Sequence, residues 1–190
     1  MKNPRPTATN AIIEAAFDVF RTNPGAGLGE VASRAGVGRA TLHRHFNGRT
    51  DLIETLIRIA SNEIDAAIAD ALEGATTATE MLHRIIVAVI PLGDRQSFLA
   101  TERPEAPDIA EKSAKQAKAF AELIEAARYE GLFAPDIPTP WIAEVFDGLV
   151  YAGWMQVQAG EITQKQAAVL AWRTLTAGTG PHNHQAGDTE

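Results

Sequence analysis

Apolar residues recur at helical spacing along almost the whole of this chain. Near the start, Ile13, Phe17 and Phe20 stand at i, i+4 and i+7, and they predict a first helix that Asn23-Pro24-Gly25 ends. The same periodicity predicts helices over about residues 28–36, 38–46, 49–72, 77–90, 108–129, 141–159 and 163–177, with at most one short helix around 96–101 and a proline-containing loop over 103–107. No window of five or more residues alternates between apolar and polar positions, so no sheet is expected. The chain is therefore predicted to be all-α, with about nine helices.

The most informative segment runs from Leu28 to Arg49. It holds two short predicted helices joined by Ala35-Gly36-Val37, where the glycine permits a tight turn and the alanine a close approach. The apolar residues expected to hold the two helices at a fixed angle are Val31, Ala32, Val37 and Leu42. The second helix presents outward-facing residues with no acid among them, namely Arg39, Ala40, Thr41, His43, Arg44 and His45. This arrangement is typical of a helix-turn-helix, whose second helix enters the major groove of double-stranded DNA.

The distribution of charge agrees with a DNA-binding segment near the start of the chain. The net charge is −7, which would argue against a nucleic-acid partner if it were spread evenly. Residues 1–50 carry seven Lys and Arg against three Asp and Glu, a balance of +4, whereas the remaining 140 residues carry ten against twenty-one, a balance of −11. A small basic module is therefore expected to contact DNA, while an acidic body stays away from it.

Composition and motifs argue against several other classes of protein. The 190 residues include no cysteine, which excludes thiolate chemistry and cysteine-ligated zinc, and no stretch approaches the ~18 apolar residues of a membrane span. His43 and His45 stand at i, i+2 on different faces of a helix, and no hydrolase, zinc-protease or P-loop motif is present, so no metal, cofactor or catalytic residue is expected. The protein is expected to be cytoplasmic. A helical protein-interaction module and a small helical enzyme are the alternatives to a DNA-binding protein.

Three sequence runs in the first part of the chain carry a family resemblance. They are IIEAAFDVF, then EVASRAGVGRATLHRHF, then a basic residue followed by Leu52 at the opening of a long helix. Over about residues 10–57 they resemble the N-terminal domain of the TetR family of bacterial transcriptional regulators. The resemblance implies base-edge contacts for Arg39 and Ala40, phosphate contacts for Thr41, His43 and Arg49, and the position of the family's recognition-helix histidine for His45.

The chain departs from the family pattern at three positions. His43 stands where a tyrosine is usual, which shortens the reach to a phosphate. Gly27 and Gly29 stand where polar or hydroxyl residues often open the second helix, which removes a helix cap and a base contact. Sequence preference is therefore expected to rest on Arg39 and Arg44.

The resemblance also implies how the rest of the chain is organised. We expect a helix-turn-helix DNA-binding domain over residues 1–50 and a helical ligand-binding and dimerisation domain over 51–178, with the helix over 49–72 bridging the two domains. Independently of the resemblance, residues 179–190 are polar and lack periodicity, so they are expected to be a disordered tail. The candidate pocket residues for a small-molecule effector are His83, Phe98, Tyr151 and Trp154. The candidate dimer contacts, on the last two helices, are Val145, Phe146, Leu149, Val157, Leu170 and Trp172. The expected function is a ligand-responsive regulator, most often a repressor in this family, which binds a near-palindromic operator as a homodimer and is released by its effector.

Overall fold

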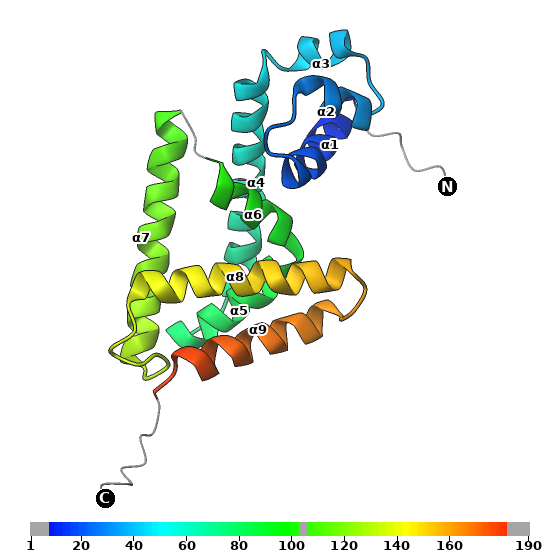
Figure 1. The fold of residues 1–190 in the computed structure, drawn as a ribbon. Coiled ribbons are helices and arrows are strands. Elements are labelled where there is room, and N and C mark those ends of the chain that lie inside the picture. The colour runs from blue at the N-terminus through cyan, green and yellow to red at the C-terminus, as the bar shows by residue number, and fades with distance from the viewer. Residues whose placement is uncertain (1–7, 103–105, 182–190) are drawn as a thin grey trace, which may run out of the picture. The chain divides into compact units, whose positions relative to one another are not determined.

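The computed structural model describes residues 8–102 and 106–181, which form nine α-helices and one 3-10 helix without any strand (Figure 1). In chain order the elements are α1 (Ala8–Thr22), α2 (Leu28–Arg34), α3 (Arg39–His45), α4 (Arg49–Leu72), α5 (Ala78–Val89), η1 (Ile90–Leu92), α6 (Gly93–Thr101), α7 (Pro107–Tyr129), α8 (Thr139–Gln158) and α9 (Gln164–Thr179). The prediction of an all-α protein with about nine helices is confirmed for these residues. Most of the predicted tail, residues 182–190, and most of the predicted loop, residues 103–105, lie outside the described residues.

The connection from α5 to α6 differs from the sequence prediction, which ends one helix near residue 90, before Pro91-Leu92-Gly93, and places at most one short helix around 96–101. Pro91 lies in the first turn of η1. N–H groups in the first turn of a helix have no acceptor within the helix, so a proline there costs no hydrogen bond. Gly93 then begins α6 with no intervening loop, and a Cβ atom on Gly93 would overlap the Cβ atom of Trp154 in α8. In the sequence, Gly93 looks like the end of a helix, but in the structure it is the point where α6 packs closely against Trp154.

Two later helices begin one or two residues earlier than the sequence predicts. The structure starts α7 at Pro107 and α8 at Thr139, with Pro140 in the first turn of α8. A proline in the first helical turn loses no hydrogen bond, because the N–H groups there have no partner within the helix. These prolines therefore open helices and do not lie in the loops before them.

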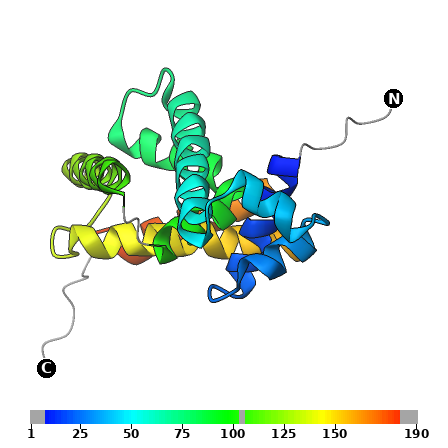
Figure 2. The ribbon, with the colours of Figure 1, turned by 90° about the horizontal axis from the view of Figure 1, so that it is seen from above.

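The described residues fall into two compact units. The first comprises the residues up to Asp65 together with Asp94–Lys112, and it holds α1 to α3, most of α4, nearly all of α6 and the first turns of α7. The three helices α1 to α3 stay together in both ribbon views (Figures 1 and 2). Burying a large aliphatic side chain contributes about 1.5–3 kcal/mol relative to exposure, so this small unit is held chiefly by its apolar core. The largest fully buried aliphatic side chains of that core are Ile12, Leu42, Leu52, Leu56 and Ile57.

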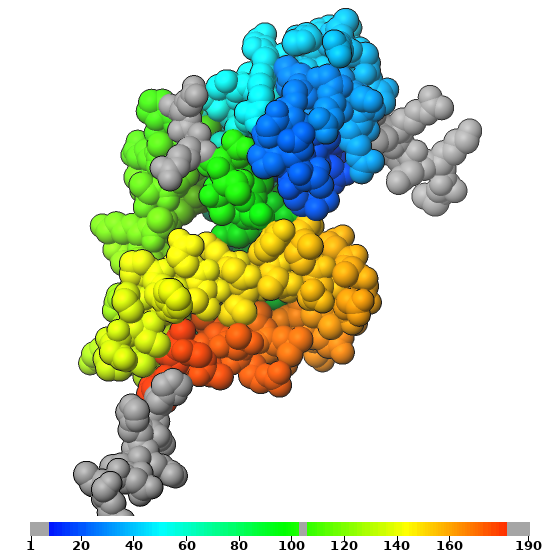
Figure 3. Space-filling model, viewed as in Figure 1, coloured from blue at the N-terminus to red at the C-terminus, as the bar shows by residue number. Residues whose placement is uncertain are grey.

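The second unit comprises Ala66–Gly93 and the residues from Ser113 onward. It holds the last turns of α4, then α5, η1, most of α7, α8 and α9. Helices α8 and α9 pack against each other and form one continuous surface in the space-filling view (Figure 3). The largest fully buried side chains of this unit are Leu82, Ile86, Ile90, Ile124, Phe133, Ile142 and Leu175.

Side-chain caps fix the start of α5 in the second unit. The carboxylate of Glu130, which follows α7, accepts hydrogen bonds from the N–H groups of Ala78 (2.7 Å) and Thr79 (2.8 Å). The hydrogen bonds from Thr79 and Ala78 hold the pKa of the Glu130 carboxyl below its ordinary value of 4.5. Thr77 adds a second cap, because its hydroxyl oxygen accepts a hydrogen bond from the N–H group of Glu80 (3.1 Å). The start of α5 is therefore satisfied by a residue that lies about fifty positions away in the sequence as well as by its neighbour.

Candidate nucleic-acid interface

A glycine in the left-handed region forms the turn between α2 and α3. Gly36 has φ +66°, a conformation that is unstrained for glycine but costly for most other residues. Its N–H group donates to the carbonyl oxygen of Ser33 (3.2 Å), and the N–H group of Val37 donates to the carbonyl oxygen of Ala32 (3.0 Å). This pair of bonds is a Schellman motif, which closes the last turn of α2. The prediction of a tight turn at Gly36 is confirmed, and the turn leads directly into α3.

The buried side of α3 leaves its opposite side facing solvent. Leu42 is fully buried, and Phe46, directly after α3, is also buried. Both belong to the core cluster that includes Val31 and Ala32 of α2. The helix contains no acidic residue, and the exposed residues on its outer side are Arg39, Ala40, His43 and Arg44. Because residues four positions apart share a helix face, these side chains make one short basic surface.

Two other predicted DNA contacts lie at the margin of this surface. Thr41 is half-buried. The Oγ1 atom of Thr9 and the Nδ1 atom of His45 are 3.2 Å apart and share a hydrogen bond. The end of α3 is therefore tied to the first turn of α1, and His45 has a polar partner within the protein.

Arg49 lies in a setting that the sequence does not reveal. Its Nη2 group donates to the carbonyl oxygen of Pro24 (2.5 Å), and its Nε group approaches that of Ala26 (3.4 Å). The guanidinium also lies 5.0 Å from the centre of the Phe20 ring, within the range of a cation–π contact. All these partners belong to α1 or to the loop between α1 and α2, more than twenty positions earlier. Arg49 therefore holds that loop against the start of α4.

Some described arginines of the first unit bond to other protein groups, and others do not. Arg34 of α2 forms an exposed ion pair with Asp18 of α1 at 2.7 Å, a kind of contact that contributes about 0–1 kcal/mol. For Arg39 and Arg44 of α3, in contrast, the described residues provide no hydrogen bond or ion pair. Of the arginines of this unit that the structure describes, these two are the ones left to meet an external anion or a base edge.

Arg95 joins α6 to α1 and α4 within the first unit. Its guanidinium contacts Glu14 of α1 at 3.1 Å and Glu63 of α4 at 3.0 Å, and it also pairs with the neighbouring Asp94. It lies 4.0 Å from the centre of the Phe17 ring. Burial alone would lower the pKa of Arg95, but Asp94, Glu63 and Glu14 outweigh burial and raise it. The side chain therefore stays charged and connects three helices.

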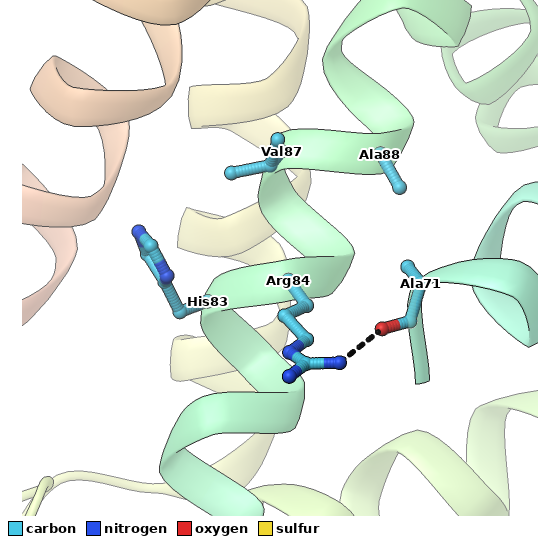
Figure 4. A pocket seen from close by; sticks show the side chains of 5 residues that line it. All are labelled: Ala71, His83, Arg84, Val87 and Ala88. Atoms are coloured by element: carbon cyan, nitrogen blue, oxygen red, sulfur yellow. Dashed lines mark hydrogen bonds between the residues drawn. The ribbon is translucent and has the colours of Figure 1, made fainter. Parts of the chain in front are cut away.

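An open hollow of about 280 Å³ lies in the second unit between the end of α4 and α5 (Figure 4). It is lined by Ala71, His83, Arg84, Val87 and Ala88. Arg84 is held in place, because it donates to the carbonyl oxygens of Ala71 (3.3 Å) and Glu73 (2.8 Å) and pairs with Glu80 at 2.6 Å. With its charge satisfied in this way, the rest of the lining is mostly apolar.

The four aromatic residues predicted to line an effector pocket occupy different settings. His83 lines the hollow and meets the ring of Trp172 edge-on, with ring centres 4.9 Å apart. Tyr151 and Trp154 stack on each other in α8, with ring centres 5.9 Å apart. Phe98 belongs to the core of the first unit, where it meets Phe17 edge-on. Of the four, His83 is the one that lines the hollow.

Helices α8 and α9 expose large apolar side chains. Those with at least 38% of their surface exposed are Trp141, Tyr151 and Met155 on α8, with Val169 and Leu170 on α9. Among the predicted dimer contacts, Leu170 is exposed, while Val145, Leu149, Val157 and Trp172 are half-buried. Phe146 lies inside the unit, where its ring meets that of Phe120 at 5.0 Å between centres. Exposed apolar residues gathered on one pair of helices are typical of a protein–protein contact surface.

Searches for two other kinds of site cover only residues 8–102 and 106–181. Over these ranges, no group of three His, Cys, Asp or Glu side chains is arranged to hold a metal ion. No helix in the same ranges combines the length and the apolar character that crossing a membrane requires.

Comparison with known proteins gives consistent matches. The sequence model described as bacterial regulatory proteins of the tetR family matches residues 12–56. The chain is 32% identical to the HTH-type transcriptional repressor LfrR of Mycolicibacterium smegmatis, with 92% of this chain and 91% of LfrR covered. It is 28% identical to the uncharacterized HTH-type transcriptional regulator Rv1255c of Mycobacterium tuberculosis, with 75% of this chain and 74% of that protein covered.

Solved structures agree with these sequence matches. The crystal structure of LfrR in complex with proflavine matches with a TM-score of 0.69 at 29% identity, covering 92% of this chain and 97% of that one. The ketosteroid transcriptional regulator KstR2 of Mycobacterium tuberculosis matches with a TM-score of 0.70 at 16% identity, covering 95% of this chain and 98% of that one. At 16% identity, the match to KstR2 shows a shared fold alone, whereas LfrR is similar to this chain in both fold and sequence.

Proposed function

Since this chain belongs to the TetR family of bacterial transcriptional regulators, we propose that it binds a near-palindromic operator as a homodimer and leaves it when a small-molecule effector binds. The observation that carries the proposal is the exposed surface of α3, which contains no acidic residue and follows the hydrogen-bonded turn of a helix-turn-helix. In this arrangement residues 1–50 contact DNA, residues 51–178 dimerise and bind the effector, and α4 is shared between them. Such a regulator acts where the bacterial chromosome lies, in the cytoplasm.

Bases are read from the start of α3. Arg39 is exposed there, and an arginine donates two parallel hydrogen bonds to the O6 and N7 atoms of guanine. Ala40, beside it, offers a methyl group suited to the methyl group of thymine. Arg44 lies one turn further along the same face and supplies a second cation at the groove.

Phosphates are held by neighbouring side chains. Thr41 and His43 offer a hydroxyl group and an imidazole N–H group, which suit phosphate oxygens. His45 and Arg49 act on DNA binding by positioning the helices, because both already bond to groups of the protein in the absence of DNA. A loss of either side chain would therefore weaken binding through the shape of the interface.

The homodimer forms through α8 and α9. Their exposed apolar residues support this choice, with Leu170 from the predicted set and Trp141, Met155 and Val169 in addition. The half-buried residues Val145, Leu149, Val157 and Trp172 would lie beside this surface. A twofold dimer presents two recognition helices about 34–36 Å apart, or at a related spacing, which matches two half-sites of a near-palindrome.

The effector site lies in the second unit. The hollow beside His83 offers an apolar lining for a small molecule. Tyr151 and Trp154, which stack on each other in α8 of the same unit and do not line the hollow, stay candidates for the effector site. The related repressor LfrR has been crystallised with proflavine, so proflavine is the first molecule to test as a ligand of this chain.

Signal transfer runs through α4, which begins beside the DNA-binding helices and ends at the hollow. The Arg95 contacts to Glu14 and Glu63 tie α6 to α1 and α4, so a displacement of α4 would also displace α1, which packs against the helix-turn-helix. An effector shifts the equilibrium only as far as it prefers one of two arrangements. Equal operator affinity for effector-bound and effector-free protein would contradict this part of the proposal.

The binding experiment is a titration of labelled duplexes. Duplexes are first selected by the purified protein from a random pool, and affinity for the selected and for random sequence is then compared by fluorescence anisotropy at fixed salt. We expect the selected duplex to bind at least about a thousandfold more tightly, which is the lower range for specific over non-specific binding. Equal affinity for both would favour a helical interaction module over a regulator.

A further inference from the structure

The guanidinium of Arg39 lies against the backbone of α2 at Gly29. A Cβ atom added to Gly29 would lie 3.0 Å from Nη2 of Arg39 and 3.3 Å from both Cζ and Nε. The three nearest atoms make up one side of the guanidinium, from Nε through Cζ to Nη2, so this side of the group approaches Gly29. Among the described residues, no hydrogen bond from the guanidinium accompanies this contact, so its N–H groups can still donate to a base.

The close approach is specific to Gly29. Gly27 and Gly38 precede α2 and α3, and a Cβ atom added to either would meet nothing within 4 Å. Gly29 also lies within α2 without the positive φ that would require a glycine. Within a helix, glycine is less favourable than alanine, so the backbone gains nothing from its presence. The missing side chain lets the Arg39 guanidinium come a few tenths of an ångström closer to α2 than a Cβ atom would allow.

Among the described residues, no hydrogen bond or ion pair holds the Arg39 side chain, which is exposed to solvent. A long side chain without a fixed direction loses conformational freedom when it binds a base. Packing against the bare backbone at Gly29 reduces that loss, because it limits the directions in which the guanidinium can point before DNA arrives.

We infer that Gly29 is a specificity-determining positioning residue, which seats the Arg39 guanidinium so that its donors face a guanine. The inference rests on the proposed function, because it concerns the base that Arg39 reads. Gly29 acts through Arg39 and needs no contact with DNA of its own. A side chain at this position therefore weakens the preference for guanine at one operator position, while the contacts to phosphates stay as they are.

The experiment compares Gly29→Ala and the larger, apolar Gly29→Leu with the matched controls Gly27→Ala and Gly27→Leu. Each variant is also made in an Arg39→Ala background. Competition anisotropy measures binding to the selected duplex, to duplexes with each other base at the position where Arg39→Ala relaxes preference, and to random duplex. Thermal unfolding is recorded for each variant.

A bidentate arginine–guanine contact discriminates against a wrong base by about five- to 150-fold. We expect the larger Gly29→Leu to reduce that discrimination at least threefold, and Gly29→Ala, whose Cβ atom displaces the guanidinium by only a few tenths of an ångström, to reduce it less. Affinity for random duplex should stay within twofold of the wild type, and the unfolding midpoint should not fall, since both new residues favour a helix more than glycine does. The Gly27 variants should discriminate like the wild type. In the Arg39→Ala background, a change at Gly29 should have no further effect on base preference.

Two results would overturn the inference while leaving the proposed function intact. One is full discrimination in both Gly29 variants. The other is an equal loss of discrimination with and without the Arg39 side chain, since Gly29 would then act by a route other than Arg39. A wild-type protein with no sequence preference at all would remove the proposed function itself, and the inference with it.

Discussion

Replacing Arg49 with Met separates its contacts within the protein from a contact with DNA. Met keeps an unbranched side chain near Phe20 but loses the donors that reach the carbonyl oxygens of Pro24 and Ala26. A hydrogen bond from a charged donor contributes about 1.5–3 kcal/mol. The hydrogen bond to Pro24 is exposed and the one to Ala26 is long at 3.4 Å. We therefore assign the two bonds together about 1.5 kcal/mol, the lower end of the range for one such bond. Adding ~0.5 kcal/mol for the exposed cation–π contact gives an expected loss of about 2 kcal/mol in the free energy of unfolding.

The assay combines thermal unfolding with DNA binding at several salt concentrations. For a chain of this size, a loss of about 2 kcal/mol lowers the unfolding midpoint by roughly 4–8 °C. Arg44→Met is the matched control, because Arg44 is exposed and its expected role is on the DNA. We expect that control to keep its midpoint and to weaken binding. If Arg44 also neutralises a phosphate, the slope of log affinity against log salt should become shallower by about 0.9. For Arg49→Met we expect a lower midpoint, weaker binding and an unchanged slope.

The opposite pattern would refute this reasoning. If Arg49→Met unfolds at the wild-type midpoint but its salt slope becomes shallower by about 0.9, then Arg49 neutralises a phosphate directly. The phosphate contact that the family resemblance implies would then be correct, and the role in holding the loop before α2 would be wrong.

The other expected outcomes concern four different parts of the molecule. Arg39→Ala should relax preference at one base, costing ~1–3 kcal/mol on the selected duplex, and an equal loss on random duplex would contradict base reading. Arg95→Met should lower the free energy of unfolding by about 1–3 kcal/mol, because three partly exposed carboxylates lose their shared cation, and chemical denaturation measures this. The pKa of the Glu130 carboxyl is lower in the folded protein than its unfolded value near 4.5, so the ionised carboxylate stabilises the fold above that pH, and this stabilisation is lost as pH falls through the folded-state pKa. The stability of Glu130→Gln should therefore depend less on pH below about pH 5 than that of the wild type. Identical stability–pH profiles for the two proteins would contradict this role of Glu130. Leu170→Glu should convert dimer to monomer in light scattering, whereas Val87→Glu, at another exposed apolar position, should not, and an intact Leu170→Glu dimer would place the interface elsewhere.

The helices and the turn were predictable because they depend on local rules. The spacing of Ile13, Phe17 and Phe20 reports the buried face of α1, and two of these three side chains are buried in the core. Gly36 marks the turn before α3, since the motif there requires a positive φ. These features depend on residues a few positions apart, so a single sequence contains them.

Contacts between distant residues were not predictable in the same way. The partners of Arg49 lie more than twenty positions earlier, and nothing in the spacing of the chain indicates that it bonds to backbone carbonyls. Phe146 has the apolar character expected of a dimer contact, but packing against Phe120 places it inside its own unit. Gly93 resembles a helix stop in sequence, and only the nearness of Trp154 reveals why a side chain is excluded there. Which face of a helix meets which neighbour is a property of tertiary packing.

Selection of bound duplexes by the purified protein from a random pool tests sequence-specific DNA binding through α3 most directly. We expect enrichment of a near-palindrome with half-sites about one helical turn apart or at a related spacing, bound at least about a thousandfold more tightly than random duplex. A pool that remains random after repeated rounds, with equal affinity for every duplex, would contradict the central claim.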